Sequence, residues 1–184
     1  MNCDCCTCRK MKEFDESKAS IKRAETRKER YKQKNAKYLN CSLVTVEFQD
    51  INNVGFLIRA AACFGVPEIH VIGYLPCYKV LKEKSGTTND LVKIYQYSNP
   101  QDFIEFFKQT GSRLVCMELS NNSVELKNIN KNGHFFLALG NETSGIPIEL
   151  MLHADQICHI KMEGPGYCLN TSQTGNIALY ELTR

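Results

Sequence analysis

The sequence predicts an α/β fold, a mostly parallel sheet flanked by helices. Two observations predict it. Short runs of apolar and β-branched residues alternate with segments whose apolar residues recur at helical spacing. Two of the runs, Leu114–Leu119 and Phe135–Leu139, are apolar apart from Glu118, as in strands buried on both faces. In a chain of 184 residues, this alternation predicts one domain over residues 41–184, preceded by a different segment over residues 1–40.

The expected elements follow in order from residue 41. Cys41–Phe48 is rich in β-branched and apolar residues and is predicted as a strand, and Asn52–Phe64 as a helix that Gly65 ends. The remaining elements are strands at Glu68–Ile72 and Lys93–Tyr97, a helix at Asp102–Lys108 after Pro100, the two apolar strands, a short helix at Ile146–Leu152 with Pro147 near its start, a strand at Ile157–Met162 and a final helix at Thr171–Leu182.

The formal net charge of +3 is distributed unevenly along the chain. Residues 1–40 hold 12 Lys and Arg against 6 Asp and Glu, a balance of +6, whereas residues 41–184 hold 11 against 14, a balance of −3. The first segment is predicted to be a basic helical arm, helical from about Lys18 to Tyr38, whose anionic partner is RNA or a membrane surface. Tyr31 and Tyr38 favour RNA, because aromatic faces stack on bases. A solvated or partly disordered extension is the other interpretation.

No apolar run approaches the roughly 18 residues that a membrane span needs, and the N-terminus lacks the apolar core of a secretory signal. We therefore expect no membrane partner and an intracellular location, cytoplasmic or organellar. Of ten cysteines, four lie in the first eight residues: Cys3, Cys5, Cys6 and Cys8. They lack a second ligand pair at finger-like spacing, so no metal site is predicted, although a soft metal and reversible acylation stay open. The other six are expected to be small buried hydrophobes without disulfides: Cys41, Cys63, Cys77, Cys116, Cys158 and Cys168.

Several common chemistries lack their motifs. The chain has no Gly-x-x-x-x-Gly-Lys loop, no Gly-x-Gly-x-x-Gly after a strand, no His-Glu-x-x-His and no Gly-x-Ser-x-Gly. Nucleotide hydrolysis, hydride transfer and zinc hydrolysis by their usual motifs are thereby excluded. The four histidines, His70, His134, His153 and His159, are isolated in sequence and are expected to pack or to face solvent.

Polar residues and glycines gather instead in three segments. In the first, residues 50–59, Asn53 lies at the start of a predicted helix, where its side chain can cap the helix or face a ligand. Arg59 follows six residues later and points about 120° away around the helix. Arg59 also interrupts an apolar run, which is costly unless the guanidinium is paired, faces a site or reaches solvent along its stem.

The second and third segments each follow a predicted strand, at the position where α/β sheets bind ligands. In residues 137–147 the strand enters a glycine-bounded turn, in which Glu142 can accept from backbone donors or face a site. Residues 160–172 form a glycine-rich loop, which indicates close backbone approach, and Asn170 or Thr171 can cap the last helix. Purely structural turns are the alternative in both places.

In order and spacing, the three segments resemble the three motifs of the SpoU branch of the SPOUT superfamily of RNA methyltransferases. The resemblance covers residues 41–184. The matching positions are Asn53 and Arg59 in motif one, Gly140, Glu142 and Gly145 in motif two, and Cys168, Leu169 and Asn170 where motif three has Ser-Leu-Asn. Each motif alone is a weak signal, but three in order are specific.

The resemblance implies a deep trefoil knot in the C-terminal part of the domain and a homodimer whose active site is shared across the interface. It implies S-adenosylmethionine as cofactor, bound by Met117, Gly140, Ile160, Met162, Cys168 and Leu169. The implied reaction is methylation of a ribose 2′-hydroxyl of RNA. The family is often drawn with this Arg as general base, but a guanidinium pKa above ~12 favours a role for Arg59 in clamping a phosphate and stabilising alkoxide charge. Asn53 and Asn170 would orient Arg59 or the ribose, and Glu142 would hold a loop or a backbone amide.

The substrate is expected to be tRNA, methylated on guanosine, because the basic arm and residues 119–124 are most similar to those tRNA enzymes. A ribosomal RNA 2′-O-methyltransferase and a non-catalytic RNA-binding relative are the alternatives. Cys168 keeps the second alternative open, because a thiol is a weaker hydrogen-bonding group than the family's serine hydroxyl.

Overall fold

The computed structural model describes residues 37–166 and 168–184, and residues Tyr38–Arg184 form one compact unit. The predictions for the arm helix and for the N-terminal cysteines lie outside the described residues, apart from Lys37 and Tyr38. The strands are β1 (Cys41–Thr45), β2 (Glu68–Ile72), β3 (Lys93–Tyr97), β4 (Arg113–Met117), β5 (Val124–Glu125), β6 (Phe135–Leu139) and β7 (Gln156–His159). The helices are α2 (Asn52–Phe64), α3 (Tyr78–Ser85), α4 (Pro100–Thr110), α5 (Ile148–Met151) and α6 (Thr171–Leu182), with 3-10 turns η2 (Gly86–Leu91) and η3 (Leu126–Asn128).

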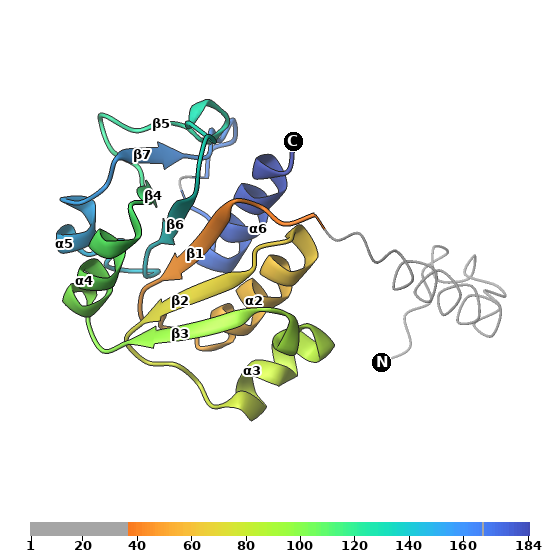
Figure 1. Ribbon diagram of the computed structural model, residues 1–184. Helices are drawn as coiled ribbons and strands as arrows, with labels where there is room; N and C mark the ends of the chain where they lie inside the picture. Colours follow the sequence, from red (N-terminus) through yellow and green to blue (C-terminus); the bar gives the residue numbers. More distant parts are fainter. Residues whose placement is uncertain (1–36, 167) are drawn as a thin grey trace, which may run out of the picture. The chain divides into compact units, whose positions relative to one another are not determined.

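The strands form one sheet in the order β3-β2-β1-β6-β4-β7-β5 (Figure 1), and every pair of neighbours in it is parallel. The predicted α/β class with a parallel sheet is therefore confirmed. Because all strands point the same way, all their carboxyl ends lie at one edge of the sheet. The loops that follow β4, β6 and β7 leave from this edge, and β4, β6 and β7 are adjacent there.

Helices cover both faces of the sheet. On one face, Leu57 of α2 and Leu179 of α6 belong to the same buried cluster as Leu137 of β6. On the other face, Phe103 of α4 clusters with Phe136, the preceding residue of β6. Successive residues of the fully buried strand β6 thus serve the two faces in turn, which explains why its sequence is apolar throughout.

Most elements lie where the sequence predicts them. Helix α2 has the predicted bounds, and Gly65 ends it at φ 75°, a left-handed conformation that glycine adopts without strain. Strands β2, β3 and β6 and helix α6 also have the predicted bounds, and α4 is longer at both ends. The predictions missed α3 and β5 and made three strands too long: β1 ends at Thr45, β4 at Met117 and β7 at His159. The short helix predicted at residues 146–152 is confined to Ile148–Met151.

The cysteine prediction is only half right. Cys41, Cys116 and Cys158 are buried free thiols, and burial raises the pKa of Cys116 and Cys158 to about 12, so both remain protonated and unreactive. Cys63, Cys77 and Cys168 are exposed, contrary to the prediction. An apolar neighbourhood in sequence does not fix the face on which a side chain lies, and these three lie on an outer helix face or in a loop.

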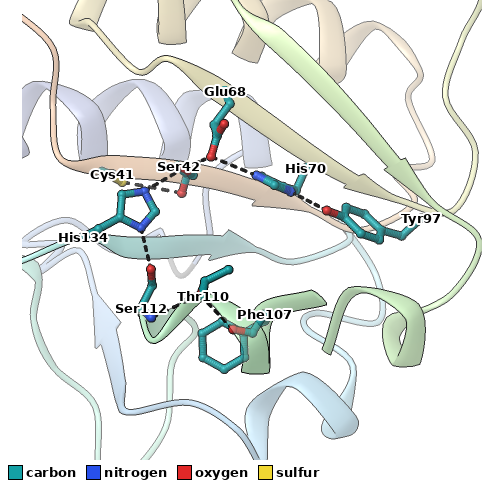
Figure 2. A network of polar contacts seen from close by, with 9 residues as sticks. All are labelled: Cys41, Ser42, Glu68, His70, Tyr97, Phe107, Thr110, Ser112 and His134. Atoms are coloured by element: carbon teal, nitrogen blue, oxygen red, sulfur yellow. Dashed lines mark hydrogen bonds and ion pairs between the residues drawn. The ribbon is translucent and has the colours of Figure 1, made fainter. Parts of the chain in front are cut away.

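A polar network joins side chains of β1, β2 and β3 to His134 on the face of the sheet that α4 covers (Figure 2). His70 is fully buried and stacks on the rings of Tyr95 and Phe106, with centroid distances of 4.9 and 5.3 Å. Its Nε2 lies 3.3 Å from Glu68 Oε1 and its Nδ1 lies 2.9 Å from the Tyr97 hydroxyl. Since a carboxylate only accepts, Nε2 donates to Glu68 and Nδ1 accepts from Tyr97, which is the pattern of a neutral imidazole.

The second histidine of the network is also satisfied as a neutral ring. Ser42 Oγ donates to Glu68 Oε1 at 2.8 Å and therefore accepts from His134 Nε2 at 2.9 Å. The Nδ1 of His134 is left to accept from Ser112 Oγ, also at 2.9 Å. The expectation that the histidines serve packing is confirmed for His70, and His134 joins it in a structural network.

This network predicts that acid destabilises the fold. Burial lowers the pKa of His70 and of His134, so between the folded and unfolded pKa values the unfolded chain binds more protons. Burial opposes ionisation of Glu68, yet hydrogen bonds from Ser42 and His70 outweigh it and its pKa is lowered as well. The histidine contribution is complete above about pH 6.5 and is lost as pH falls through the lowered pKa values, whereas Glu68 adds to the loss only below about pH 4.5.

We therefore expect urea unfolding midpoints to fall between pH 7.5 and pH 5. A His70→Gln variant should show a shallower dependence, and His153→Gln, outside the network, should keep the wild-type dependence. An unchanged slope in His70→Gln would contradict the assignment of the acid sensitivity to this ring.

Candidate active site

A cavity of about 280 Å³ lies at the carboxyl edge of the sheet, where the loops after β4, β6 and β7 meet the start of α6. We call it the first cavity. All six residues that the resemblance implies for cofactor binding line it: Met117, Gly140, Ile160, Met162, Cys168 and Leu169. Glu142, implied as a catalytic residue, lines it as well. The second and third sequence segments therefore meet the loop after β4 because β6, β4 and β7 are adjacent parallel strands, and the first segment is joined to them through Asn53 and Glu142.

A tight turn after β6 forms one wall of the cavity. The backbone N–H and C=O groups of Asn141 and Gly145 exchange two hydrogen bonds of 3.0 Å each, and Asn141 Oδ1 accepts from the backbone N–H of Thr143 at 2.8 Å. Gly140 allows this close return, because a Cβ there would stand 2.7 Å from the carbonyl carbon of Gly145. A side chain at position 140 would thus collide with backbone rather than with a movable group.

Glu142 links the second segment to the first. Its Oε2 accepts from the backbone N–H of Gln49 at 2.9 Å, and its Oε1 accepts from the side-chain amide of Asn53. The expectation that Glu142 accepts from a backbone donor is confirmed. Asn53 is the second residue of α2 and is buried, so it lies at the start of the helix as predicted. Its amide is directed to Glu142, and no hydrogen bond joins it to Arg59 in the part of the chain that the structure describes.

Asn170 and Thr171 join the third segment to the second. Asn170 caps α6, since its Oδ1 accepts from the backbone N–H groups of Ser172 and Gln173 at 2.8 and 3.3 Å. Thr171 Oγ1 donates to the carbonyl of Gly140 at 3.0 Å. The predicted capping role of Asn170 is confirmed, and the start of α6 is fastened to the turn after β6.

Sequence reasoning missed Glu118 as a site residue. It follows β4 directly and lines the first cavity, and its Oε2 accepts from the backbone N–H of Ile146 at 3.2 Å. A carboxylate at the carboxyl end of a buried parallel strand was the signal that could have identified it. Glu118 and Glu142 make the cavity acidic, and no Lys or Arg is among its described lining residues.

Apolar side chains are exposed at the rim of this cavity. Leu119 is 69% exposed, Leu169 40% and Met162 39%. Such exposure has an unfavourable hydration free energy that a bound small molecule would remove. Cys168 is exposed beside them and lines the cavity, with its thiol at the position of the family's serine.

Arg59 lies apart from the first cavity. Its side chain is exposed on α2 and is not among the lining residues. A Cβ placed on Gly86, at the start of η2, would stand 3.7 Å from its Nη2. Within residues 37–166 and 168–184, Arg59 makes no hydrogen bond or ion pair with another side chain. Within one protomer, the structure therefore brings Asn53, Glu142 and the cavity together and leaves Arg59 outside.

Metal ligands and membrane-spanning helices were sought among the described residues. No group of three or more His, Cys, Asp or Glu side chains in this part of the chain is placed to hold a metal ion. Among the same residues, no helix is long and apolar enough to cross a membrane.

Comparison with known proteins gives one family. The sequence model of the SpoU rRNA Methylase family matches residues 40–180. Among curated proteins, the tRNA (guanosine(18)-2'-O)-methyltransferase of Escherichia coli (strain K12) is 28% identical over 133 residues, covering 72% of this chain and 58% of the relative. The protein of the same name from Aquifex aeolicus (strain VF5) is 29% identical over 136 residues, covering 72% of this chain and 64% of the relative.

A solved structure gives the same result for the fold. The AdoMet-bound rRNA methyltransferase from Sinorhizobium meliloti superposes with a TM-score of 0.70 at 26% identity, covering 77% of this chain and 55% of the other. The chain thus spans less than two thirds of the length of these three proteins.

Proposed function

Because the chain belongs to the SpoU rRNA Methylase family, we propose that it transfers a methyl group from S-adenosylmethionine to a ribose 2′-hydroxyl of RNA. The observation that carries the proposal is the first cavity, which motifs two and three line together with the loop after β4, and which Asn53 of motif one joins through its hydrogen bond to Glu142. The tRNA guanosine methyltransferases among its relatives favour tRNA as the substrate and guanosine as the methylated nucleotide.

The first cavity suits S-adenosylmethionine in chemistry. Its volume of about 280 Å³ lies just below the range for small-molecule sites, roughly 300–1,000 Å³. Apolar groups such as Met117 and Ile160 can contact the cofactor's apolar atoms, and the carboxylates of Glu118 and Glu142 suit its positive sulfonium and ammonium groups. When bound, S-adenosylmethionine supplies an electrophilic methyl group.

The chain's own residues would position the attacking hydroxyl and stabilise the charge that develops on it. Arg59 stays protonated, so it acts by holding a phosphate and stabilising alkoxide charge. Glu142 and Asn53 act as positioning residues, because their hydrogen bonds fix the turn after β6 against the segment after β1. Asn170 positions the third segment by capping α6.

A homodimer would reconcile the role of Arg59 with its location. Arg59 is exposed and lies outside the first cavity of its own protomer, so we propose that it completes the cavity of a second copy. Exposed apolar side chains on α2 and on α6, which packs against α2, support an interface there: Phe56 of α2 is 40% exposed, and Ile177 and Tyr180 of α6 are 41% and 54% exposed.

The remaining proposals follow the family. We propose that the C-terminal segment threads a loop as a trefoil knot, which the contact of Thr171 with Gly140 supports. We also propose that residues 1–40, with their charge balance of +6, contribute to RNA affinity, that no membrane partner is involved, and that the protein acts inside the cell.

The decisive experiment offers the full chain methyl-labelled S-adenosylmethionine with separate pools of tRNA and rRNA. We expect label in tRNA at a 2′-O-methyl guanosine, identified by resistance of the adjacent phosphodiester bond to alkali. Label only in rRNA would replace the tRNA substrate by the ribosomal one. Cofactor binding without label in either pool would favour a non-catalytic RNA-binding protein.

A further inference from the structure

A second cavity of about 430 Å³ lies beside the first, at the carboxyl ends of β1, β2 and β3. Four segments line it: residues 46–49 after β1, residues 72–73 at the end of β2, residues 98–100 before α4, and the turn after β6. The two cavities share Asn141. Nothing in the proposed binding of cofactor uses the second cavity.

The turn after β6 separates the two cavities. Glu142 and Thr143 line the first, whereas Ser144 and Pro147 line the second. The Asn141 side chain donates to the backbone carbonyl of Glu47, so the turn is fastened to the segment that forms the opposite wall. A ligand in the second cavity would therefore lie across one turn from a ligand in the first.

The walls of the second cavity combine apolar surface with few polar groups. Val46, Phe48 and Ile72 are buried, and Pro100 and Pro147 add apolar rings. Side chains of Gln49, Ser98 and Asn99 offer hydrogen bonds. This is the composition of a site for a flat, partly apolar ligand with polar edges.

Glu47 is the one charged residue among the described residues that line the second cavity. Its carboxylate makes no hydrogen bond or ion pair with another described residue, so its acceptor sites are available. It lies over Gly73, where a Cβ would stand 2.9 Å from Glu47 Oε2. The absence of a side chain at position 73 thus leaves the space that this carboxylate occupies.

We propose that the second cavity receives the guanine base of the nucleotide whose ribose is methylated, and that Glu47 binds its Watson–Crick edge. The proposal rests on the proposed function. Guanine presents two adjacent donors on that edge, N1–H and the N2 amino group, and a carboxylate presents two acceptors. Adenine and cytosine would place a ring-nitrogen lone pair against the carboxylate, and uracil would place two carbonyl oxygens beside it.

The negative charge of Glu47 also excludes a phosphate group of the RNA backbone from the second cavity. A negative carboxylate without a neighbouring cation repels a phosphate, so the second cavity does not suit the RNA backbone. Selection by unpaired polar groups is strong, because the wrong base leaves a donor or an acceptor unsatisfied. Glu47 is therefore the residue that we assign to base selection.

The test uses the full chain with Glu47→Gln and, as matched control, Glu105→Gln on the exposed face of α4. We expect Glu47→Gln to lower kcat/KM on the guanosine substrate by about 10–100-fold, since hydrogen bonds to a charged group are at stake. Its affinity for S-adenosylmethionine and its melting temperature should match those of the control. RNA with inosine at the methylated position lacks the N2 amino group and should be a poorer substrate for wild type but not for Glu47→Gln. Equal kcat/KM for Glu47→Gln and wild type would overturn the proposal.

Binding of free nucleosides separates this proposal from the proposed function. Equilibrium dialysis with guanosine, adenosine, cytidine and uridine needs no methyl transfer. Guanosine binding that Glu47→Gln abolishes and S-adenosylmethionine does not compete with supports the second cavity, even if no RNA is methylated. If RNA is methylated but guanosine binds no better than the other three, or is displaced by S-adenosylmethionine, the proposed function stands and the guanine site is wrong.

Discussion

Replacing Arg59 by alanine is expected to lower kcat for methyl transfer by about 10²–10³-fold, the usual effect of removing one group that stabilises transition-state charge. The affinity for S-adenosylmethionine should not change, because Arg59 does not line the first cavity. Stability should change little, since Arg59 is exposed and makes no ion pair in the described part of the chain. Single-turnover rates with saturating RNA would measure the effect, and Lys108→Ala on α4 provides a control for the loss of a positive charge. Wild-type rates in Arg59→Ala would contradict the assigned role.

Mixing two inactive variants tests whether Arg59 acts across the dimer. Arg59→Ala keeps an intact first cavity. Gly140→Val keeps Arg59, but the added side chain disrupts the turn after β6 and with it the first cavity of the same protomer. If Arg59 serves the partner's cavity, a mixed dimer contains one complete site and activity returns. If Arg59 serves its own protomer, no combination of the two variants is active. Recovery after mixing and subunit exchange is the expected result.

Replacing Gly140 by alanine is expected to abolish most cofactor binding and to destabilise the domain by about 1–3 kcal/mol, the usual range for forcing extra atoms into a packed site. A Cβ at position 140 would stand 2.7 and 2.8 Å from backbone atoms of Gly145 and Ile146. The two strands of the turn must then separate, which breaks the paired hydrogen bonds between Asn141 and Gly145. The wall of the first cavity moves with them.

Isothermal titration with S-adenosylmethionine and urea unfolding would measure both effects. Gly164→Ala is the matched control, because a Cβ there meets nothing within 4 Å and its φ is not positive. We expect the control to bind cofactor as the wild type does. Normal cofactor affinity in Gly140→Ala would show that the turn adapts and that the close return is not required.

Much of the site could be predicted because motifs and strand ends coincide. Helix α2 has the predicted bounds since its apolar residues recur at helical spacing and a glycine ends it. The second and third polar segments were expected to be functional because they follow strands, and in a parallel sheet all strands end at one edge. Adjacency in the sheet, with β4 between β6 and β7, then brings the loops together.

The errors at the strand ends have one physical cause. The predicted strands continued past Thr45, Met117 and His159 because apolar residues continue there. Those residues are apolar for another reason. Ile160 and Met162 line the first cavity. Val46 and Phe48 line the second and also belong to the buried clusters, so an apolar side chain beyond a strand end meets a pocket or the core without extending the strand. A run of apolar residues indicates that the side chains are buried or contact a ligand, but it does not show where a strand ends.

Helix α3, strand β5 and two carboxylates of the cavities could not be predicted from the sequence. Helix α3 carries four charged residues and one tyrosine in its eight positions and has only Leu81 and Ser85 buried, so its apolar pattern is weak. Strand β5 has two residues, too few for any alternation. Glu47 and Glu118 each lie one or two residues beyond a strand, and only the tertiary structure shows that their carboxylates border cavities.

The strand order has a consequence for folding. Strands β1, β2 and β3 are neighbours both in sequence and in the sheet, so this half can assemble from nearby parts of the chain. The other half cannot, because β6 must reach back to β1 and β4 becomes enclosed between β6 and β7. Pairings between distant segments carry the larger loop-closure entropy and slow the search. The loops after β4, β6 and β7 belong to this slower half, so the ability to bind cofactor should arise in the last stage of folding.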